Sequence, residues 1–246
     1  MIADRLVAHR GYPKHYPENT LLGLSKAIEA RAKFIEMDIL FSADQQPVLY
    51  HDTLMTRISG VENAIHLLTL DELCQHPAHE PERLGQTFAT EHITPLSALA
   101  GLLSDHPDVT AFIELKRTGL ETAGIENAYR IVTKVLGPVI GQCVLISFSD
   151  EFIQYAHEQQ FSRLGVVLKD WQDRQGPWIT DIQPEFIFCD TDKIPEGASL
   201  DELQSTVVIY EVEDPDQAIE WFNRGADMVE TFDIGSMITN LAHRAL

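Results

Sequence analysis

Potential acid, base and metal-binding side chains are concentrated in the first fifth of the 246-residue chain. In chain order, these residues are His9, Arg10, Glu36, Asp38 and His51. Paired carboxylates suit a hard divalent cation, and histidines are the side chains that most often transfer protons. Arginine presents a planar fork of N–H groups that matches phosphate oxygens. The order and close spacing of these groups predict a divalent metal and two acid/base histidines acting on a phosphodiester.

Two apolar runs carry acidic and basic side chains at alternating positions. Alternation along an extended strand places Glu36 and Asp38 on one face, about 6–7 Å apart. The same alternation places Glu114 and Lys116 together on one face of a later strand. Buried carboxylates are costly unless something neutralises them, so Glu114 would complete a three-carboxylate metal site. Lys116 would contact a phosphate, or else form a Glu114–Lys116 pair that serves only stability.

Both histidines occur where a strand is expected to end. His9 directly follows the apolar run Arg5–Ala8. His51 ends a second run, Val48–Tyr50, and Asp52 lies next to it. Active sites of barrel proteins are built where strands end. A lone histidine is more often structural than catalytic, but two of them flanking an acidic pair favour a functional interpretation.

Strand and helix patterns alternate along most of the chain. The run Val48–Tyr50 follows its predecessor too closely for a parallel crossover, which predicts an antiparallel hairpin. The other expected strands are Arg5–Ala8, Phe34–Leu40, Val109–Leu115, Cys143–Ser147, Leu164–Leu168, Phe186–Cys189, Thr206–Val212 and Met228–Thr231. Eight such strands in about 250 residues indicate a (β/α)8 TIM barrel. A doubly wound open sheet is the alternative, but one barrel domain over residues 1–246 accounts for all eight strands.

Helical patterns fill most of the intervals between these strands. The clearest are the apolar stripe from Leu21 to Ile28, then Thr122–Leu136, Asp150–Gln160 and Pro215–Asn223. Asn19 or Thr20 is expected to cap the first of them. Residues 54–94 break the alternation, with little strand signal and irregularly spaced histidines. We expect an insertion over the catalytic end of the barrel, with its histidines at the surface.

Composition and charge narrow the class of protein and its partners. A hydrophobic content of 44% and a charged content of 23% are ordinary for a soluble globular chain. The net charge of −20 argues against nucleic acid and anionic membrane surfaces as partners. Three widely spaced cysteines suit a reducing compartment. Since neither a signal peptide nor a membrane-spanning run is evident, the sequence predicts a cytoplasmic protein without a stable membrane anchor.

The motifs occur in an order that resembles the signature of the glycerophosphodiester phosphodiesterase family. They are His9-Arg10-Gly11, Pro17-Glu18-Asn19-Thr20, Glu36-Met37-Asp38, His51-Asp52 and Glu114-Leu115-Lys116. Each motif is common by itself, but the ordered set is specific. The resemblance extends weakly to the C-terminus and so covers nearly the whole chain.

The resemblance implies a fold, a cofactor and a reaction. The fold is the (β/α)8 barrel, and the cofactor is one divalent cation, Mg²⁺ or Ca²⁺. The reaction is hydrolysis of small glycerophosphodiesters, such as glycerophosphocholine or glycerophosphoethanolamine, to sn-glycerol 3-phosphate and an alcohol. By their positions in the motifs, Glu36, Asp38 and Glu114 match the metal ligands of the family.

The resemblance also implies roles for the other polar groups. His9 and His51 match the general acid/base pair. Arg10 and Lys116 match positions that contact the phosphate. The residues expected to orient their neighbours rather than react are Glu18 and Asp52. These motifs do not specify the attacking group. It is either water or a glycerol hydroxyl of the substrate, and the second would form a cyclic phosphate.

The chain departs from the family pattern in its last two strands. In place of Trp-Thr-Val-Asn and Ile-Thr-Asp it has Tyr210-Glu211-Val212-Glu213 and Val229-Glu230-Thr231-Phe232. Tyr210 puts a smaller aromatic ring with a hydroxyl group at a substrate-binding position. Glu211 and Glu230 add acid near the catalytic end, although alternation would turn one of them away. We expect these changes to affect substrate preference and to leave the metal and histidine set intact.

Two other classes of protein fit part of the pattern. One is a different phosphodiesterase on the same scaffold, such as a lysophospholipase D-like enzyme or a phosphatidylinositol-specific phospholipase C. Such enzymes are typically secreted or act on membranes, which the acidic charge and the cysteine pattern disfavour. The other is a barrel that binds a ligand without catalysis, and the intact set of histidines and carboxylates argues against it.

Overall fold

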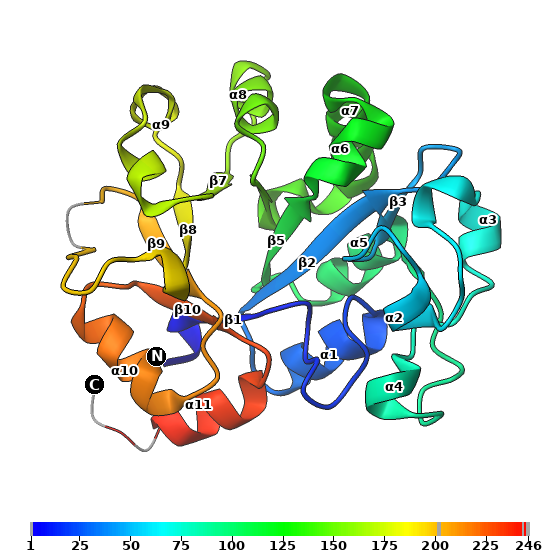
Figure 1. Cartoon of the computed structure of the whole chain (residues 1–246), viewed down its shortest axis with the longest axis horizontal. Coiled ribbons are helices and arrows are strands. Elements are labelled where there is room, and N and C mark those ends of the chain that lie inside the picture. The colour runs from blue at the N-terminus through cyan, green and yellow to red at the C-terminus, as the bar shows by residue number, and fades with distance from the viewer. Residues whose placement is uncertain (1, 201–202, 243, 245–246) are drawn as a thin grey trace.

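Eight parallel strands close into a barrel in the computed structural model, which describes residues 2–200, 203–242 and 244 (Figure 1). Around the ring the order is β1, β2, β5, β6, β7, β8, β9 and β10, and β10 pairs with β1. These strands are β1 (Leu6–Ala8), β2 (Phe34–Phe41), β5 (Thr110–Leu115), β6 (Cys143–Ser147), β7 (Leu164–Val167), β8 (Phe186–Asp190), β9 (Thr206–Tyr210) and β10 (Met228–Thr231). The predicted (β/α)8 barrel is confirmed.

Helices cover the outside of the barrel (Figure 1). They are α1 (Leu21–Glu29), α5 (Leu96–Asp105), α6 (Arg117–Ala123), α7 (Ile125–Leu136), α8 (Asp150–Glu158), α9 (Pro177–Ile182), α10 (Pro215–Asn223) and α11 (Ile234–Ala242). Short 3-10 turns are Ile2–Arg5, Ile65–Leu67, Gly137–Gln142, Trp171–Gln175 and Thr191–Lys193. The single helix predicted over 122–136 is wrong, because Gly124 adopts a φ of 76° and separates α6 from α7. No helix in the described ranges is long and apolar enough to cross a membrane.

Alternation along each strand produces two apolar layers. Side chains that point outward, such as Ile35 and Met37 on β2, pack against the helices. Side chains that point inward fill the barrel, where the Phe112 ring lies 4.8 Å from that of Phe186 and 5.1 Å from that of Phe188. These three rings form an apolar floor, and the polar groups of the next layer lie at the carboxyl ends of the strands.

Two antiparallel strands and three short helices are added beside β2. The predicted hairpin is present, because β3 (Pro47–Leu49) pairs antiparallel with the end of β2. The sequence did not predict β4 (Thr94–Pro95), which pairs with β3 and closes the insertion. The helices between them are α2 (Thr56–Ser59), α3 (Leu70–Leu73) and α4 (Pro81–Leu84). This segment has its own apolar core, which includes Tyr50 and Met55.

Candidate active site

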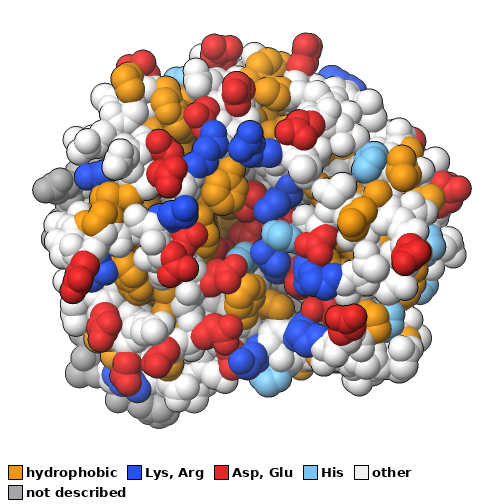
Figure 2. Space-filling view, viewed as in Figure 1, with side chains coloured by type: hydrophobic (Ala, Val, Ile, Leu, Met, Phe, Trp, Pro, Cys, Tyr) orange, Lys and Arg blue, Asp and Glu red, His pale blue; other side chains and the backbone are white. Residues whose placement is uncertain are grey.

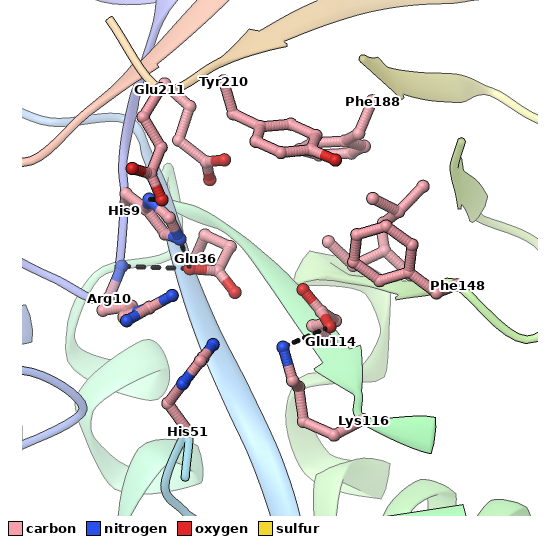
Figure 3. A pocket seen from close by; sticks show the side chains of 13 residues that line it. His9, Arg10, Glu36, His51, Glu114, Lys116, Phe148, Phe188, Tyr210 and Glu211 are labelled. Carbon is pink, nitrogen blue, oxygen red and sulfur yellow. Dashed lines mark hydrogen bonds and ion pairs between the residues drawn. The ribbon is translucent and has the colours of Figure 1, made fainter. Parts of the chain in front are cut away.

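A pocket of about 220 Å³ opens at the carboxyl ends of the strands (Figures 2 and 3). Seven of the predicted site residues line it, namely His9, Arg10, Glu36, His51, Glu114, Lys116 and Tyr210. Asp38 is fully buried beneath them, and it contacts both Arg10 and Lys116. Glu18 and Asp52 do not line the pocket but bind to residues that do. The structure therefore brings all of the predicted residues to one end of the barrel.

A tight turn after β1 brings His9 and Arg10 to the pocket. Arg10 and Gly11 both have a positive φ, of 53° and 88°. A Cβ atom on Gly11 would lie 2.8 Å from a backbone carbon of Gly23 in α1, so only glycine fits this approach. The turn is thereby held against α1, and the backbone N–H of Arg10 donates to Glu36 Oε2 at 3.0 Å.

The segment Pro17–Thr20 connects α1 to the acidic strand β2. Thr20 Oγ1 accepts a hydrogen bond from the backbone N–H of Gly23 at 3.0 Å and so caps α1, a contribution of about 1 kcal/mol. Asn19, with a φ of 54°, donates from Nδ2 to Asp38 Oδ2 at 2.9 Å. Its Oδ1 accepts the backbone N–H of Asp38 at 3.0 Å. One side chain thus fixes the orientation of the Asp38 carboxylate.

Three buried carboxylates converge under the pocket. Glu36, Asp38 and Glu114 each place one oxygen within 4.8 Å of the others. Each also has one buried oxygen that accepts no hydrogen bond. Lys116 Nζ lies 3.0 Å from Glu114 Oε1 and 3.3 Å from Asp38 Oδ1, close enough for ion pairs. Clustered carboxylate oxygens without hydrogen bonds are the ligands that Mg²⁺ and Ca²⁺ take, so these residues fit the predicted cation.

The three carboxylates differ in how their charge is balanced. Burial, reinforced by the charge of Asp38, raises the pKa of Glu36 well above its usual value. Burial also raises the pKa of Glu114, although Lys116 opposes it. At Asp38, burial favours the neutral form, but Arg10 and Lys116 outweigh it and hold the pKa below its usual value. Asp38 is therefore ionised and paired, whereas the charges of Glu36 and Glu114 are less fully compensated by their neighbours.

His51 belongs to a chain of ion pairs that passes through Arg57 of the insertion and ends at Arg10. Its Nδ1 lies 2.6 Å from Asp52 Oδ1, and Asp52 accepts two hydrogen bonds from Arg57, at 2.7 and 3.0 Å. Arg57 also donates to both oxygens of the buried Glu18, at 2.8 and 2.9 Å. Arg10 reaches the same carboxylate at 3.2 Å. Sequence reasoning missed Arg57, because no local pattern reveals a partner that comes from the insertion.

His9 is almost fully buried, with 6% of its surface exposed. Its ring stacks on Phe232, with 4.7 Å between centroids and 14° between planes. His9 Nε2 lies 3.6 Å from Glu36 Oε2, and Nδ1 lies 3.3 Å from Glu211 Oε1. Burial, and then the charge of Arg10, lower the pKa of His9 well below its usual value. The imidazole is therefore neutral near pH 7.

Glu211 and Glu230 both line the pocket, contrary to the expectation that one would turn away. Glu230 lies on the inward face of β10 and is 3% exposed, while Glu211 follows β9 and is partly exposed. Burial, with the charge of Glu114, raises the pKa of Glu230 well above its usual value. Alternation along β10 was the available signal, because Val229 and Thr231 face outward and Glu230 between them must then face inward.

The opposite wall of the pocket is apolar. Ile146, Phe148, Val167 and Phe188 line it, together with the ring of Tyr210 (Figure 3). Burial raises the pKa of Tyr210 above its usual value, so its phenol remains neutral at ordinary pH. The pocket thus has a charged wall from β1 to β5 and an apolar wall from β6 to β9.

The fold and site place the chain among the (β/α)8-barrel proteins that carry carboxylates, histidines and cationic side chains at the ends of their strands. The profile of the Glycerophosphoryl diester phosphodiesterase family matches residues 9–136, which is about half of the chain, and the protein belongs to this family.

Similar proteins include a glycerophosphodiester phosphodiesterase from Caldanaerobacter subterraneus, 33% identical over 50% of this chain and 49% of its own length. A Bacillus subtilis protein, described as a putative glycerophosphodiester phosphodiesterase, is 32% identical over 65% of this chain and 61% of its own length. The matched parts thus span between 49% and 61% of the length of these two curated relatives.

Solved structures share the whole fold at lower sequence identity. An Oleispira antarctica phosphodiesterase, determined with its product sn-glycerol 3-phosphate, has a TM-score of 0.83 and 22% identity, covering 97% of this chain and 96% of its own. A putative glycerophosphoryl diester phosphodiesterase from Silicibacter pomeroyi has a TM-score of 0.83 and 17% identity, covering 97% and 93%. At these identities the likeness shows the fold alone.

Proposed function

We propose that this protein hydrolyses small glycerophosphodiesters to sn-glycerol 3-phosphate and an alcohol, with a divalent cation held by Glu36, Asp38 and Glu114. The observation that carries the proposal is the joint presence, in one pocket, of this carboxylate group and two imidazoles. Family membership supports the same reaction. When bound, Mg²⁺ or Ca²⁺ supplies positive charge that polarises a phosphoryl oxygen.

Arg10 and Lys116 bind and orient the phosphodiester. Asp38 and Glu114 outweigh the effect of burial and raise the pKa of Lys116, so its ammonium group is charged at neutral pH. Arg10 is also held in place, because its guanidinium contacts both Glu18 and Asp38. Two fixed positive groups aimed at the phosphate neutralise charge that grows in the transition state.

His9 and His51 transfer the protons. One accepts a proton from the attacking hydroxyl or water, and the other donates a proton to the leaving alkoxide. Their settings differ, since His9 is buried and neutral, whereas His51 lies at the mouth and is oriented by Asp52. A neutral imidazole is able to accept a proton at once, which suits His9 to the role of base.

The proposal extends to the setting in which the protein works. The described cysteines, Cys74, Cys143 and Cys189, are all free thiols, which supports a reducing compartment such as the cytoplasm. The net charge of −20 supports a small-molecule substrate and argues against a nucleic-acid partner.

The experiment is a substrate panel with product identification. Glycerophosphocholine, glycerophosphoethanolamine, lysophosphatidylcholine and bis(p-nitrophenyl) phosphate are incubated with the protein and Mg²⁺ or Ca²⁺. We expect sn-glycerol 3-phosphate and the free alcohol from the first two, measured by a coupled dehydrogenase assay and by mass spectrometry. Release of phosphocholine in place of choline, or turnover of the lysophospholipid alone, would contradict the proposal.

A further inference from the structure

A second group of potential metal ligands lies beside the first. His9, Glu36 and Glu230 each place one ligand atom within 4.8 Å of the others, and all three are buried. Glu36 belongs to both groups, so the two cation positions are adjacent. The second group differs in chemistry, because it combines an imidazole nitrogen with two carboxylates, whereas the first has carboxylates alone.

Two members of this second group, Glu36 and Glu230, have a buried oxygen without a hydrogen bond. Glu230 is 3% exposed, and its Oε1 accepts no hydrogen bond. Glu36 Oε1 is likewise buried without a hydrogen bond. Each buried acceptor that lacks a partner has lost its hydration without compensation, and this cost is larger when the group is charged. A cation that contacts both oxygens would remove this cost.

The net charge of the groups around the pocket is negative enough to be balanced by two divalent cations. Five carboxylates meet here, those of Glu36, Asp38, Glu114, Glu211 and Glu230, against the two permanent cations Arg10 and Lys116. The site therefore has an excess of three negative charges when all of these groups are ionised. One divalent cation leaves it negative, and the phosphodiester adds one more negative charge. A second divalent cation brings the loaded site close to neutral.

The orientation of His9 suits it to be a ligand. Nδ1 lies 3.3 Å from Glu211 Oε1, an ion-pair distance at which the structure shows no hydrogen bond (Figure 3). Nε2 lies 3.6 Å from Glu36 Oε2, and its lone pair is available to a cation when the ring proton is on Nδ1. Histidines that bind a metal commonly donate their other ring N–H to a carboxylate, and Glu211 is the carboxylate beside Nδ1 that would take this role.

We propose that His9, Glu36 and Glu230 form a second cation site that selects Zn²⁺ over Mg²⁺ and Ca²⁺, and that Zn²⁺ bound there inhibits the enzyme. An imidazole with two carboxylates is a donor set that Zn²⁺ uses, whereas Mg²⁺ and Ca²⁺ favour oxygen ligands alone. The inhibitory part rests on the proposed function, because an Nε2 lone pair bound to Zn²⁺ is not free to accept a proton. Glu230 is thus assigned to cation binding and has no part in the proposed proton transfer.

The test counts bound zinc directly, without substrate. The full-length protein is equilibrated with ZnCl₂ in excess MgCl₂, desalted, and its zinc measured by plasma mass spectrometry, with affinities from calorimetry. We expect the wild type to hold one more Zn²⁺ per chain than Glu230→Gln, or to bind that Zn²⁺ at least about 10-fold more tightly. Glu213→Gln is the matched control, since it removes the same charge from an exposed position paired with Lys14. Circular dichroism checks that each variant is folded.

A second measurement separates this inference from the proposed function. Zinc inhibition of glycerophosphocholine hydrolysis should need at least about 10-fold more Zn²⁺ in Glu230→Gln than in the wild type. Equal zinc content and affinity in the wild type and Glu230→Gln would overturn the second site, even if the enzyme is active. A zinc difference in a protein that releases no sn-glycerol 3-phosphate would support the site and refute the proposed function.

Discussion

The two walls of the pocket differ in both chemistry and origin. The charged wall comes from β1 to β5 and their loops, and it includes both histidines, Arg10 and Lys116. The wall from β6 to β9 is mostly aliphatic and aromatic, with Phe148 and Phe188 facing the cavity (Figure 3). The profile of the family matches residues 9–136, which contain the whole charged wall and none of the apolar one.

This division separates the reaction from its specificity. The three carboxylates of the first cation site and both histidines come from the half that matches the family. The half outside the match contributes Tyr210, Glu211 and Glu230 to the pocket. We therefore expect changes in the charged wall to lower kcat, and changes in the apolar wall to act on substrate binding.

The largest effect is expected at the histidines of the charged wall. His9→Ala and His51→Ala should each lower kcat for glycerophosphocholine by about 10²-fold or more, because each removes a proton-transfer group. Steady-state kinetics measure this, and His66→Ala, at an exposed position of the insertion, is the control. Near-normal turnover in either variant would remove that histidine from the mechanism.

A smaller loss of kcat is expected at Arg57, which does not line the pocket but binds Asp52 and Glu18. Arg57→Ala leaves Asp52 and Glu18 without their shared partner, so His51 is held less firmly. We expect kcat to fall about 10-fold, the effect of about 1.4 kcal/mol, which is typical of one lost hydrogen bond to a charged group. Arg130→Ala, on the exposed face of α7, should leave kcat unchanged. An unaltered kcat in Arg57→Ala would show that the insertion does not contribute to the site.

The apolar wall should respond differently. Phe148→Ala removes a partly buried ring that faces the cavity. We expect KM to rise about fivefold, roughly 1 kcal/mol of lost apolar contact, with kcat within about twofold of the wild type. A fall in kcat with KM unchanged would contradict the division between the two walls.

The smallest effect concerns Glu230, an acid next to the apolar wall. Its raised pKa means that the folded protein resists ionisation of a carboxyl group that ionises freely in the unfolded chain. Stability is therefore retained below the ordinary carboxyl pKa of 4.5 and falls as the pH rises above it. Glu230→Gln stays neutral, so in EDTA at pH 7.5 we expect its Tm to be about 2–4 °C higher than that of the wild type.

Thermal scans at several pH values measure this gain. It should shrink as the pH falls toward 4.5, because the wild-type carboxyl group then becomes neutral as well. Glu213→Gln, at an exposed position, should show no such pH-dependent gain. A lower Tm for Glu230→Gln in EDTA at pH 7.5 would contradict the claim that this carboxylate is uncompensated in the absence of a cation.

The sequence predicted the barrel well, because its signals are local. Strand alternation identified the eight barrel strands within about two residues and placed Glu36, Asp38 and Glu114 on inward faces. The capping signal was equally local, and the structure selects Thr20 over Asn19, since Asn19 binds Asp38 instead.

What the sequence did not predict depends on contacts between distant segments. Arg57 reaches Glu18 from 39 residues away, across the insertion. Glu211 approaches His9 only because β9 and β1 lie on either side of β10 in the closed ring. Periodicity predicts which side chains share a face of a strand, but it does not predict which distant loop contacts that face. Such partners are therefore identified only from the three-dimensional structure.

Cation dependence of product release tests the central claim most directly. The protein is stripped with EDTA, and sn-glycerol 3-phosphate release from glycerophosphocholine is followed before and after addition of excess Mg²⁺ or Ca²⁺. We predict that EDTA lowers the rate by at least about 100-fold and that one of the two cations restores it in the wild type but not in Glu114→Gln. A full rate in EDTA, or full restoration in Glu114→Gln, would contradict the assignment of the charged wall as a cation-dependent phosphodiesterase site.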